Sequence, residues 1–405
     1  MAADARRLAG PALAAALRDA RATTLARTLD ANDGAWDVPL QPGVNPLAWE
    51  LGHLAWFAEF WILRGPHRLG GDGFVHASRP PRIAGPDAIF DSARLAHDER
   101  WQVALPSRDA LRARLSSQLE ACIAALPAEE LAGEEADAAN YFHRLALFHE
   151  DMHGEAFAWL RATLGWPAPA GIALTAKRAA APLRIEGGTI ALGRAAHEPG
   201  FAFDNEAPAE TVRVEPFEID AAPLANADFL AFVEAGGYQR PELWPGPAGT
   251  WRARRGLSHP ERWRRAEGGW QMRWFDRWQP LELADPLVHV SAWEAEAYCR
   301  WAGRRLPRAA EWECAARDPR FTWGGSVWEW TADAFRPYSG FVPGPYADYS
   351  APWFGDHREL RGGSFATHAR LHDARYRNFF VADRSDVFAG FRTAALHPAT
   401  PKGTR

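Results

Sequence analysis

The sequence predicts a multidomain protein, in which an all-α helical bundle is followed by an α+β domain. Up to about residue 165, apolar residues recur at three- and four-residue intervals, as on one face of an amphipathic helix. Beyond this point the chain shows short strand-like runs, and most of its 20 tryptophans lie beyond residue 240. A stretch rich in Pro, Ala and Gly separates the two patterns, which is typical of a linker. We therefore expect a bundle over 1–165, a linker over 166–183 and an α+β domain over 184–397.

Composition narrows the class of protein before any motif is considered. The 405 residues are too many for one ordinary hydrophobic core, and no run approaches the ~20 consecutive apolar residues that a membrane span needs. A net charge of −5 offers no electrostatic reason to bind nucleic acid. Cys122, Cys299 and Cys314 lack CxxC spacing, so they predict neither a disulfide framework nor a cysteine-zinc site. We expect a cytoplasmic protein without a nucleic-acid or membrane partner.

Four segments of the first domain carry the helical period. The first is the Ala- and Arg-rich N-terminal stretch, where charged residues interrupt every apolar block and so argue against a targeting peptide. The other three are 46–65, 108–126 and 137–165, each bounded by Pro, Gly or Asp. Four such helices pack most economically as a bundle. The long polar connection 66–106 is of a length that is more often functional than idle.

The second domain combines short strand-like runs with only two convincing helices. These are 226–237 and 291–303, and a glycine ends each of them, as expected at a helix C-terminus. The remainder is rich in loops and aromatic residues. The pattern is typical of an α+β domain with short strands.

Two histidines stand four residues apart inside an apolar helical stretch of the first domain. His149 and His153 lie about 40° apart on one helix face and can hold one ion together, while Met152 borders this face and Glu155 points away. His53 lies in another apolar helix, and facing helices of a bundle commonly build metal sites. Three neutral imidazoles leave coordination positions open, as in catalytic sites, and suit iron, zinc or copper. The plain alternative is that all three are ordinary polar or core histidines.

Five motifs of the second domain appear in a fixed order along the chain. They are FDNEAPAETVRVEPFEID (203–220), VSAWEAEAYCRWAGRRLPRAAEWECAAR (290–317), VWEWT (327–331), RGGSF (361–365) and FAGFR (388–392). Together they resemble the formylglycine-generating-enzyme-like domain, which implies a C-type-lectin-related α+β fold over nearly all of 184–397. A true formylglycine-generating enzyme uses a cysteine pair late in this domain, but here RGGSF is followed by ATHARLHDARYRN, without cysteine.

The first domain resembles a DinB-type four-helix bundle through His53 and the H-x3-H-x-E stretch that begins at His149. A lone DinB-type protein, such as a zinc-dependent thiol transferase, would end near residue 165. The pairing of both domains is similar to the EgtB family of non-heme iron synthases. This resemblance implies an O2-dependent oxidoreductase that uses Fe(2+) and adds a chalcogen to C2 of the imidazole of hercynine, which is trimethylated histidine.

Three residues of the second domain carry over from this resemblance. The family's catalytic tyrosine lies in a PYxxYS stretch, here PYADYS, so the resemblance implies Tyr346 as the proton donor and Tyr349 as a substrate-pocket residue, and Asn378 matches a substrate-contacting asparagine. The quaternary ammonium of hercynine also favours aromatic faces, for which the candidates are Phe379, Trp330 and Trp353. The alternative for Tyr346 is a role in aromatic packing.

Elsewhere the chain departs from the family's pattern, at positions that we keep as substrate-binding candidates. Phe380 stands where many members have an aspartate for the ammonium of gamma-glutamylcysteine, while Arg384 matches their arginine. The loop that carries basic residues for the carboxylates of that dipeptide reads LAHDERWQVALPSR and keeps only Arg100 nearby. Met152 replaces the usual glutamine before the second histidine of the helix. Because unpaired charges are costly to bind, we expect a second substrate that is less charged.

One branch of the family fits that expectation. The selenoneine synthases, called SenA, couple hercynine to a selenosugar, which is neutral. We favour this branch, with hercynine, a selenosugar and O2 as substrates. The first alternative is an ergothioneine sulfoxide synthase that uses cysteine, gamma-glutamylcysteine or another thiol. The second, from another class, is a lectin-like binding protein without catalysis.

Overall fold

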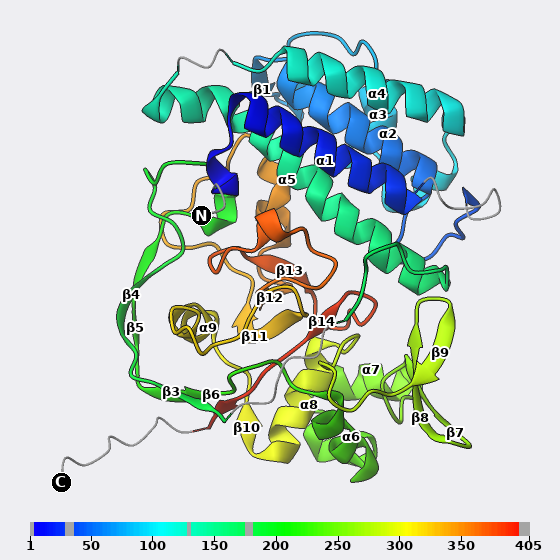
Figure 1. Cartoon of the computed structure of the whole chain (residues 1–405), viewed down its shortest axis with the longest axis vertical. Helices are drawn as coiled ribbons and strands as arrows, with labels where there is room; N and C mark the ends of the chain where they lie inside the picture. Colours follow the sequence, from blue (N-terminus) through cyan, green and yellow to red (C-terminus); the bar gives the residue numbers. More distant parts are fainter. Residues whose placement is uncertain (1–3, 29–35, 128–130, 175–180, 397–405) are drawn as a thin grey trace. The chain divides into compact units, whose positions relative to one another are not determined.

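The computed structural model describes residues 4–28, 36–127, 131–174 and 181–396 (Figure 1). The chain forms two compact units. The first comprises Met1–Ala170 and His197–Ala202, and the second comprises Gly171–Ala196 and Phe203–Arg405. The predicted linker 166–183 includes residues 175–180, which lie outside the described residues.

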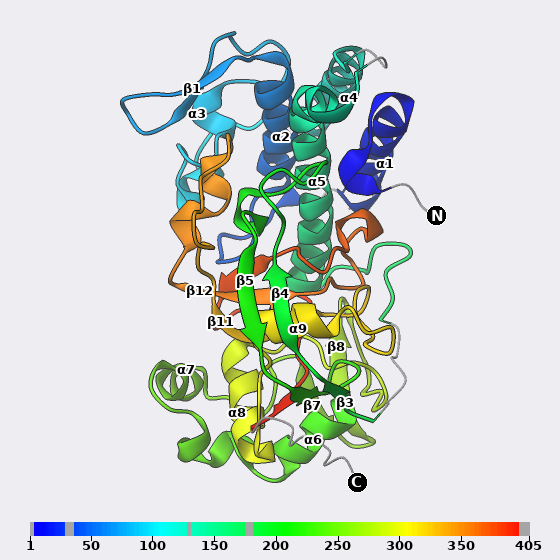
Figure 2. The same cartoon turned by 90° about the vertical axis from the view of Figure 1, so that its left-hand side faces the viewer.

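Four long helices form the first unit within its described residues. They are α1 (Gly10–Thr28), α2 (Leu47–Ala58), α4 (Arg108–Ala124) and α5 (Gly133–Leu164). Helix α1 packs against α5, and α2 packs against both α4 and α5 (Figures 1 and 2). The predicted helical bundle is confirmed. None of the helices in the described ranges has the length and apolar content that a membrane span requires.

The ends of these helices follow from local sequence. The hydroxyl of Ser107 accepts a hydrogen bond from the backbone N–H of Ala110 at 3.3 Å and so caps α4. Helix α5 ends at Gly165, whose positive φ of 70° suits a residue without a Cβ. Helix α2 continues directly into a π-helical turn, η3 (Glu59–Leu63), a form that often accompanies functional sites. Helix α5 begins four residues before the predicted start at 137, because its first turn contains acidic residues that are favourable there.

The connection 66–106 contains short elements that sequence analysis did not predict. They are β1 (His67–Leu69), β2 (Val75–Ala77), α3 (Asp87–Phe90) and η4 (His97–Trp101). Two polar contacts tie this connection to α2 and its continuation. The buried carboxylate of Glu59 accepts three backbone N–H bonds from residues 82–84 at 2.7–3.0 Å. Arg64 forms a bidentate ion pair with Asp87 at 2.6 and 3.0 Å.

The second unit is built from short strands in several small sheets. One sheet has the order β10–β15–β6–β3, a second has the order β13–β12–β11–β14, and smaller sheets are β4–β5 and β7–β8–β9. The bounds are β3 (Leu183–Ile185), β4 (Gly188–Leu192), β5 (Glu210–Val214), β6 (Phe217–Ile219), β7 (Trp263–Ala266), β8 (Gly269–Trp274) and β9 (Arg277–Pro280). The later strands are β10 (Arg304–Arg305), β11 (Trp328–Ala334), β12 (His357–Arg361), β13 (Asn378–Val381), β14 (Ala389–Gly390) and β15 (Ala394–Ala395). Figure 2 shows β4 and β5 as an extended hairpin.

The described part of the second unit has four helices, of which only two were predicted. The predicted ones are α6 (Asn226–Glu234) and α8 (Ala292–Ala302), and α8 begins with a capping box between Ser291 and Glu294. Helices α7 (Pro247–Arg255) and α9 (Ala309–Ala315) were missed. Helix α7 contains a proline, a glycine and three arginines and has few apolar residues, whereas the seven-residue α9 is almost wholly buried and shows little contrast between an apolar and a polar face. The α+β class itself is confirmed.

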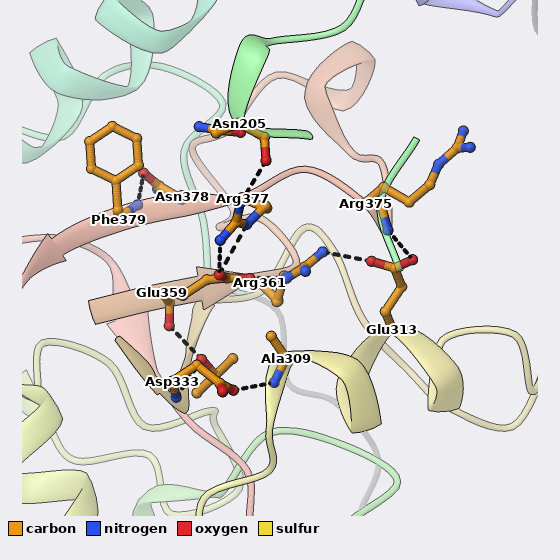
Figure 3. A network of polar contacts seen from close by, with 12 residues as sticks. Asn205, Ala309, Glu313, Asp333, Glu359, Arg361, Arg375, Arg377, Asn378 and Phe379 are labelled. Atoms are coloured by element: carbon orange, nitrogen blue, oxygen red, sulfur yellow. Dashed lines mark hydrogen bonds and ion pairs between the residues drawn. The ribbon is translucent and has the colours of Figure 1, made fainter. Parts of the chain in front are cut away.

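Buried charge surrounds the central strands of the second unit (Figure 3). We call Glu313, Glu359, Arg361 and Arg377 the arginine–glutamate network. Glu359 on β12 lies 2.7 Å from both Arg361 and Arg377, and Arg361 lies 3.0 Å from Glu313. Each of the four is at most 2% exposed. Such a network fixes the strands that carry it, because every member is matched by an opposite charge.

All three cysteines are free and buried, as their spacing predicted. Burial raises the pKa of the Cys122 thiol to about 12. The thiol of Cys122 is therefore protonated at neutral pH and packs as a small apolar group.

Candidate metal centre

The three predicted histidines converge in the first unit. His53 comes from α2, and His149 and His153 come from successive turns of α5. One nitrogen from each lies within 4.8 Å of the others, and the Nε2 atoms of His53 and His149 are 3.3 Å apart. We call these residues the histidine cluster. Their predicted convergence is confirmed.

The tautomer of His53 follows from its surroundings. Its Nδ1 lies 2.7 Å from the carbonyl oxygen of Phe90 at the end of α3. A carbonyl only accepts hydrogen bonds, so Nδ1 carries the proton and Nε2 keeps a lone pair directed toward the cluster. Trp49 holds the ring from one side, with ring centroids 5.0 Å apart and planes 9° from parallel.

His149 is held by an aromatic face. The ring of Phe57 lies parallel to its imidazole, with centroids 3.6 Å apart. Burial lowers the pKa of His149 well below its ordinary value, and the neighbouring His153 and His53 lower it further. Burial, together with the charge of His153, also lowers the pKa of His53 to about 3. Both imidazoles are thus neutral at physiological pH and available as ligands.

A buried carboxylate orients the third histidine. Oε2 of Glu50 lies 2.7 Å from Nδ1 of His153, and Oε1 of Glu50 accepts a hydrogen bond of 2.6 Å from the side-chain amide of Asn45. Burial alone would raise the pKa of Glu50, but the charge and hydrogen bond of His153 and the bond from Asn45 lower it to about 2. Glu50 is therefore ionised, and a carboxylate behind a ligating histidine is typical of metal centres.

Glu50, Trp49 and Asn45 were missed by sequence analysis, although a signal exists for two of them. Glu50 and Trp49 precede His53 by three and four residues, which places all three on one face of α2. A carboxylate within an apolar helix is costly to bury unless it is paired. Glu50 could therefore have been predicted as a partner of a neighbouring histidine.

These residues fit a divalent metal ion. Two nitrogens that share one ion at about 2.1 Å lie roughly 3.0–3.4 Å apart, and the 3.3 Å separation of His53 and His149 falls in this range. The outer nitrogens of His53 and His153 already face an oxygen, so their inner nitrogens are the ones that face the cluster. The alternative of three unrelated polar histidines does not explain why one nitrogen from each lies within 4.8 Å of the others. The donor set suits iron, zinc or copper.

Three other predicted residues of the first unit lie near the cluster. Met152 is half-buried on α5, beside His153 in sequence. Glu155 is buried, and its charge raises the pKa of Arg27, although burial is the larger effect and lowers that pKa overall. The guanidinium of Arg100 donates to Asn45 at 2.8 Å and lies 4.0 Å above the ring of Trp49.

The predicted tyrosines lie on one loop of the second unit. We call residues 344–350 the tyrosine loop. Tyr346 is half-buried and precedes η8 (Ala347–Tyr349), and its ring centroid is 6.0 Å from that of Tyr349. Tyr349 stacks on Phe203 with centroids 4.4 Å apart, and its hydroxyl is 3.0 Å from that of Tyr376. The proposed role of Tyr346 stays a prediction.

One carboxylate, which sequence analysis did not single out, anchors this loop at two points. Asp204 in η5 (Asp204–Glu206) accepts a 3.3 Å hydrogen bond from the backbone N–H of Gly344 and a short hydrogen bond from the hydroxyl of Ser350. Tyr346 lies between these two attachment points in sequence. Asp204 belongs to the FDNEAP stretch, so the motif was the available signal.

The remaining candidates lie on or just after β13. The side-chain oxygen of Asn378 accepts a 2.9 Å hydrogen bond from the N–H of Phe379 (Figure 3). Phe379 stacks on Phe335 with centroids 4.1 Å apart. The guanidinium of Arg384 lies 5.0 Å from the centre of the Phe380 ring. The substrate contacts predicted for these residues stay predictions.

Comparison with known protein families agrees with this two-part architecture. A model of the DinB superfamily matches residues 16–157. A model of the sulfatase-modifying factor enzyme 1-like domain matches residues 171–327 and 320–396. The two matches fall on the helical and the α+β part of the chain.

Individual relatives cover either the whole chain or its second part. Hercynine oxygenase from Mycobacterium tuberculosis is 33% identical to this chain, over 94% of the chain and 98% of that protein. Hercynine oxygenase from Mycolicibacterium thermoresistibile is 32% identical, over 94% of each chain. Formylglycine-generating enzyme from Streptomyces coelicolor is 32% identical, over 50% of this chain and 83% of that protein.

Proposed function

Because the chain belongs to the hercynine oxygenase family, we propose that it uses iron and O2 to join a chalcogen to C2 of the imidazole of hercynine. The observation that carries this proposal is the histidine cluster, since it brings one nitrogen from each of three imidazoles within 4.8 Å of the others. In the proposed reaction, the C2–H bond of hercynine and the chalcogen–H bond are lost and a carbon–chalcogen bond forms. O2 accepts four electrons, and its two oxygen atoms end in water and on the chalcogen.

The residues of the first unit have the task of holding the metal. His53, His149 and His153 would bind Fe(2+), which when bound supplies the redox chemistry that no side chain offers. The carbonyl of Phe90 and the carboxylate of Glu50 fix the rings of His53 and His153. The imidazoles then need no reorganisation to present their lone pairs, which is the contribution of a preorganised site.

The residues of the second unit have the task of handling protons and substrate. We assign Tyr346 as the proton donor, because its phenolic O–H is protonated at neutral pH and can donate a proton or a hydrogen atom. The two attachments of the tyrosine loop to Asp204 limit the positions that Tyr346 can adopt. Asn378 and Tyr349 are assigned to the substrate pocket.

The finer proposal is that the chalcogen donor is a selenosugar. Two observations support a donor of low charge. Phe380 offers an apolar ring where an ammonium-binding carboxylate would be needed for a dipeptide. The guanidinium of Arg384 forms two hydrogen bonds to the carboxylate of Asp386, at 2.6 and 2.7 Å, so an opposite charge already matches it.

A thiol donor is the second candidate. The arginine at position 384 is retained, and it would pair with a substrate carboxylate if it exchanged Asp386 for it. Cysteine or gamma-glutamylcysteine would then be the donor, and the product would be the sulfoxide precursor of ergothioneine. The lectin-like binding protein without catalysis is disfavoured, because it does not account for the histidine cluster.

A single competition assay tests both levels of the proposal. The iron-loaded protein is given hercynine and O2 with equal concentrations of a selenosugar, cysteine and gamma-glutamylcysteine, and products are followed by mass. We expect the selenosugar adduct to dominate. Dominance of a sulfur adduct would reverse the assignment of the donor. Absence of every adduct, without O2 consumption that depends on hercynine, would overturn the hercynine oxygenase proposal itself.

A further inference from the structure

Arg100 lies outside the histidine cluster but contacts two of the residues that surround it. Arg100 lies in η4 (His97–Trp101), on the connection between α2 and α4. The resemblance to the family suggests that Arg100 binds substrate. Its contacts, however, lead by two separate routes to two of the three histidines.

The first route consists of hydrogen bonds. Arg100 donates to the side-chain oxygen of Asn45 at 2.8 Å, and the amide nitrogen of Asn45 donates to Oε1 of Glu50 at 2.6 Å. The other oxygen of Glu50 lies 2.7 Å from Nδ1 of His153. These partners define the orientation of the Asn45 amide, since only its oxygen can accept from a guanidinium and only its nitrogen can donate to a carboxylate. The carboxylate behind His153 is thereby held from its far side.

The second route consists of stacked rings. The guanidinium carbon of Arg100 lies 4.0 Å from the centre of the Trp49 ring, which is close for a cation over an aromatic face. The ring of His53 is also stacked on Trp49, with centroids 5.0 Å apart and nearly parallel planes. The indole N–H of Trp49 donates to the carbonyl of Ile89 at 2.7 Å, so the ring cannot rotate freely. Trp49 therefore transmits the position of Arg100 to His53.

We propose that Arg100 is a positioning residue of the metal centre, which holds the rings of His53 and His153 in their ligating orientation through Trp49 and through Asn45 and Glu50. This inference rests on the proposed function, because it assumes that the histidine cluster binds a metal. It favours an internal role for the guanidinium over the binding of a substrate carboxylate. Partners behind the ligands of a metal typically contribute 10- to 100-fold to its affinity.

The test compares two arginines of the same connection. Arg100→Met keeps the apolar stem and removes both the charge and the donors. Arg94→Met is the matched control, since Arg94 also lies over an aromatic ring, that of Phe74 at 4.4 Å, and pairs with Asp91 at 3.0 Å. No contact to the histidines is recorded for it among the described residues. Arg100→Lys tests rescue, because an ammonium can still donate to Asn45 and lie over Trp49.

Three measurements are made on the full chain after removal of bound metal. Titration with Co(II), followed by ligand-field absorption, reports affinity and coordination, dialysis against Fe(II) gives the iron affinity, and urea unfolding of the metal-free protein gives its stability. For Arg100→Met we expect a roughly tenfold or greater loss of Co(II) and Fe(II) affinity and an altered Co(II) spectrum. Arg94→Met should retain the wild-type affinity, and Arg100→Lys should lie between. None of these measurements needs hercynine or turnover.

Results of two kinds would overturn the inference alone, namely no effect of Arg100→Met or an effect that is not specific to the metal centre. One is an affinity and a Co(II) spectrum of Arg100→Met that equal those of the wild type. The other is an equal loss of affinity in Arg94→Met, or a loss in Arg100→Met that is fully accounted for by lower stability of the metal-free protein. A wild-type protein that takes up no metal would instead overturn the metal centre, and with it the proposed function.

Discussion

The two units bury polar groups in opposite ways. In the arginine–glutamate network of the second unit, Glu359 is matched by both Arg361 and Arg377. In the histidine cluster of the first unit, by contrast, the Nε2 atoms of His53 and His149 lie 3.3 Å apart and no opposite charge stands between them. A closed network stabilises one arrangement of the chain, whereas converging imidazole nitrogens are suited to a cation that comes from outside.

The difference extends to the partners that surround each group. Glu50 and the carbonyl of Phe90 lie against the outer nitrogens of His153 and His53, so the inner nitrogens of these two rings face the cluster. Arg361 in the second unit instead directs its nitrogens to Glu359, Glu313 and the hydroxyl of Tyr338. Buried charge alone therefore does not mark a functional site. The informative feature is whether the buried polar atoms are matched by opposite charges or converge on a point where a cation could bind.

The largest expected effect comes from removing one ligand of the histidine cluster. His149→Ala should lower the affinity for Fe(II) by at least about 10³-fold and abolish product formation, because two imidazoles remain where three are needed. The metal-free variant should unfold at a urea concentration close to that of the metal-free wild type, since no closed network is broken. His143→Ala is the control, because His143 lies on the same helix and is bonded to the carbonyl of Cys122 at 3.0 Å. Full metal uptake by His149→Ala would contradict the assignment.

The second effect should appear in stability and leave metal binding unchanged. Glu359→Gln leaves Arg361 and Arg377 buried without their shared countercharge, which we expect to lower the free energy of unfolding by about 3–5 kcal/mol. Urea unfolding measures this change, and Fe(II) affinity of the folded variant should equal that of the wild type. Glu215→Gln, which removes an exposed pair with Arg213, should change stability by less than about 1 kcal/mol. Equal effects of the two variants would show that the network is not more stabilising than a surface pair.

The third expected effect is a loss of turnover that leaves metal binding unchanged. Tyr346→Phe removes the phenol that we assign as proton donor, so kcat should fall by roughly 10²- to 10⁴-fold while Fe(II) affinity stays the same. Product formation from hercynine under saturating substrate measures it. Tyr349→Phe keeps the stack on Phe203 and should have a smaller effect. A Tyr346→Phe variant with near-normal kcat would assign Tyr346 to aromatic packing.

A smaller effect should come from loosening the tyrosine loop. Ser350→Ala removes one of the two attachments to Asp204, and the loss of position should lower kcat by about tenfold. Ser339→Ala is a suitable control, because Ser339 is exposed and its recorded contact uses the backbone N–H. Metal affinity serves as the second readout and should not change. Unaltered kcat in Ser350→Ala would show that the attachment at Gly344 is sufficient.

Much of the fold and of the metal centre could be predicted from periodicity and spacing. His149 and His153 are neighbours on any helix, and the apolar helix around His53 belongs to the same bundle. The same helix geometry places Glu50 beside His53. These predictions succeed because helix geometry is local and independent of the rest of the chain.

The contacts that could not be predicted are those that depend on how loops and short irregular segments fold in space. Arg100 and Asn45 are 55 residues apart, and their contact depends on how the connection 66–106 folds back on α2. Asp204 reaches Ser350 across an even longer separation. The helix α9 was missed for a related reason, because a fully buried helix shows no contrast between an apolar and a polar face.

The smallest expected effect is a pH dependence of stability, which differs between the histidine cluster and the arginine–glutamate network. The ordinary pKa of histidine is about 6.5, and that of His53 in the folded protein is about 3. Between these values the unfolded chain takes up a proton that folded His53 does not, so the free energy of unfolding of the metal-free protein falls as pH is lowered. Glu359 behaves differently, because its pKa is lowered from an ordinary value of 4.5: burial opposes this shift, but Arg377 and Arg361 outweigh it. The contribution of Glu359 to the free energy of unfolding is therefore present above pH 4.5 and is lost only below this pH.

The two pH ranges therefore distinguish the histidine cluster from the arginine–glutamate network. Lowering the pH from 7.5 to 5.5 should cost the metal-free wild type about 1.4 kcal/mol through His53 alone, while the contribution of Glu359 stays constant. Urea unfolding of wild type and His53→Gln at both pH values isolates this amount, since the other histidines are common to both proteins. We expect the variant to lose about 1.4 kcal/mol less than the wild type. Equal losses in the two proteins would mean that His53 takes up a proton near its ordinary pKa in the folded protein. This result would contradict its assignment as a metal ligand.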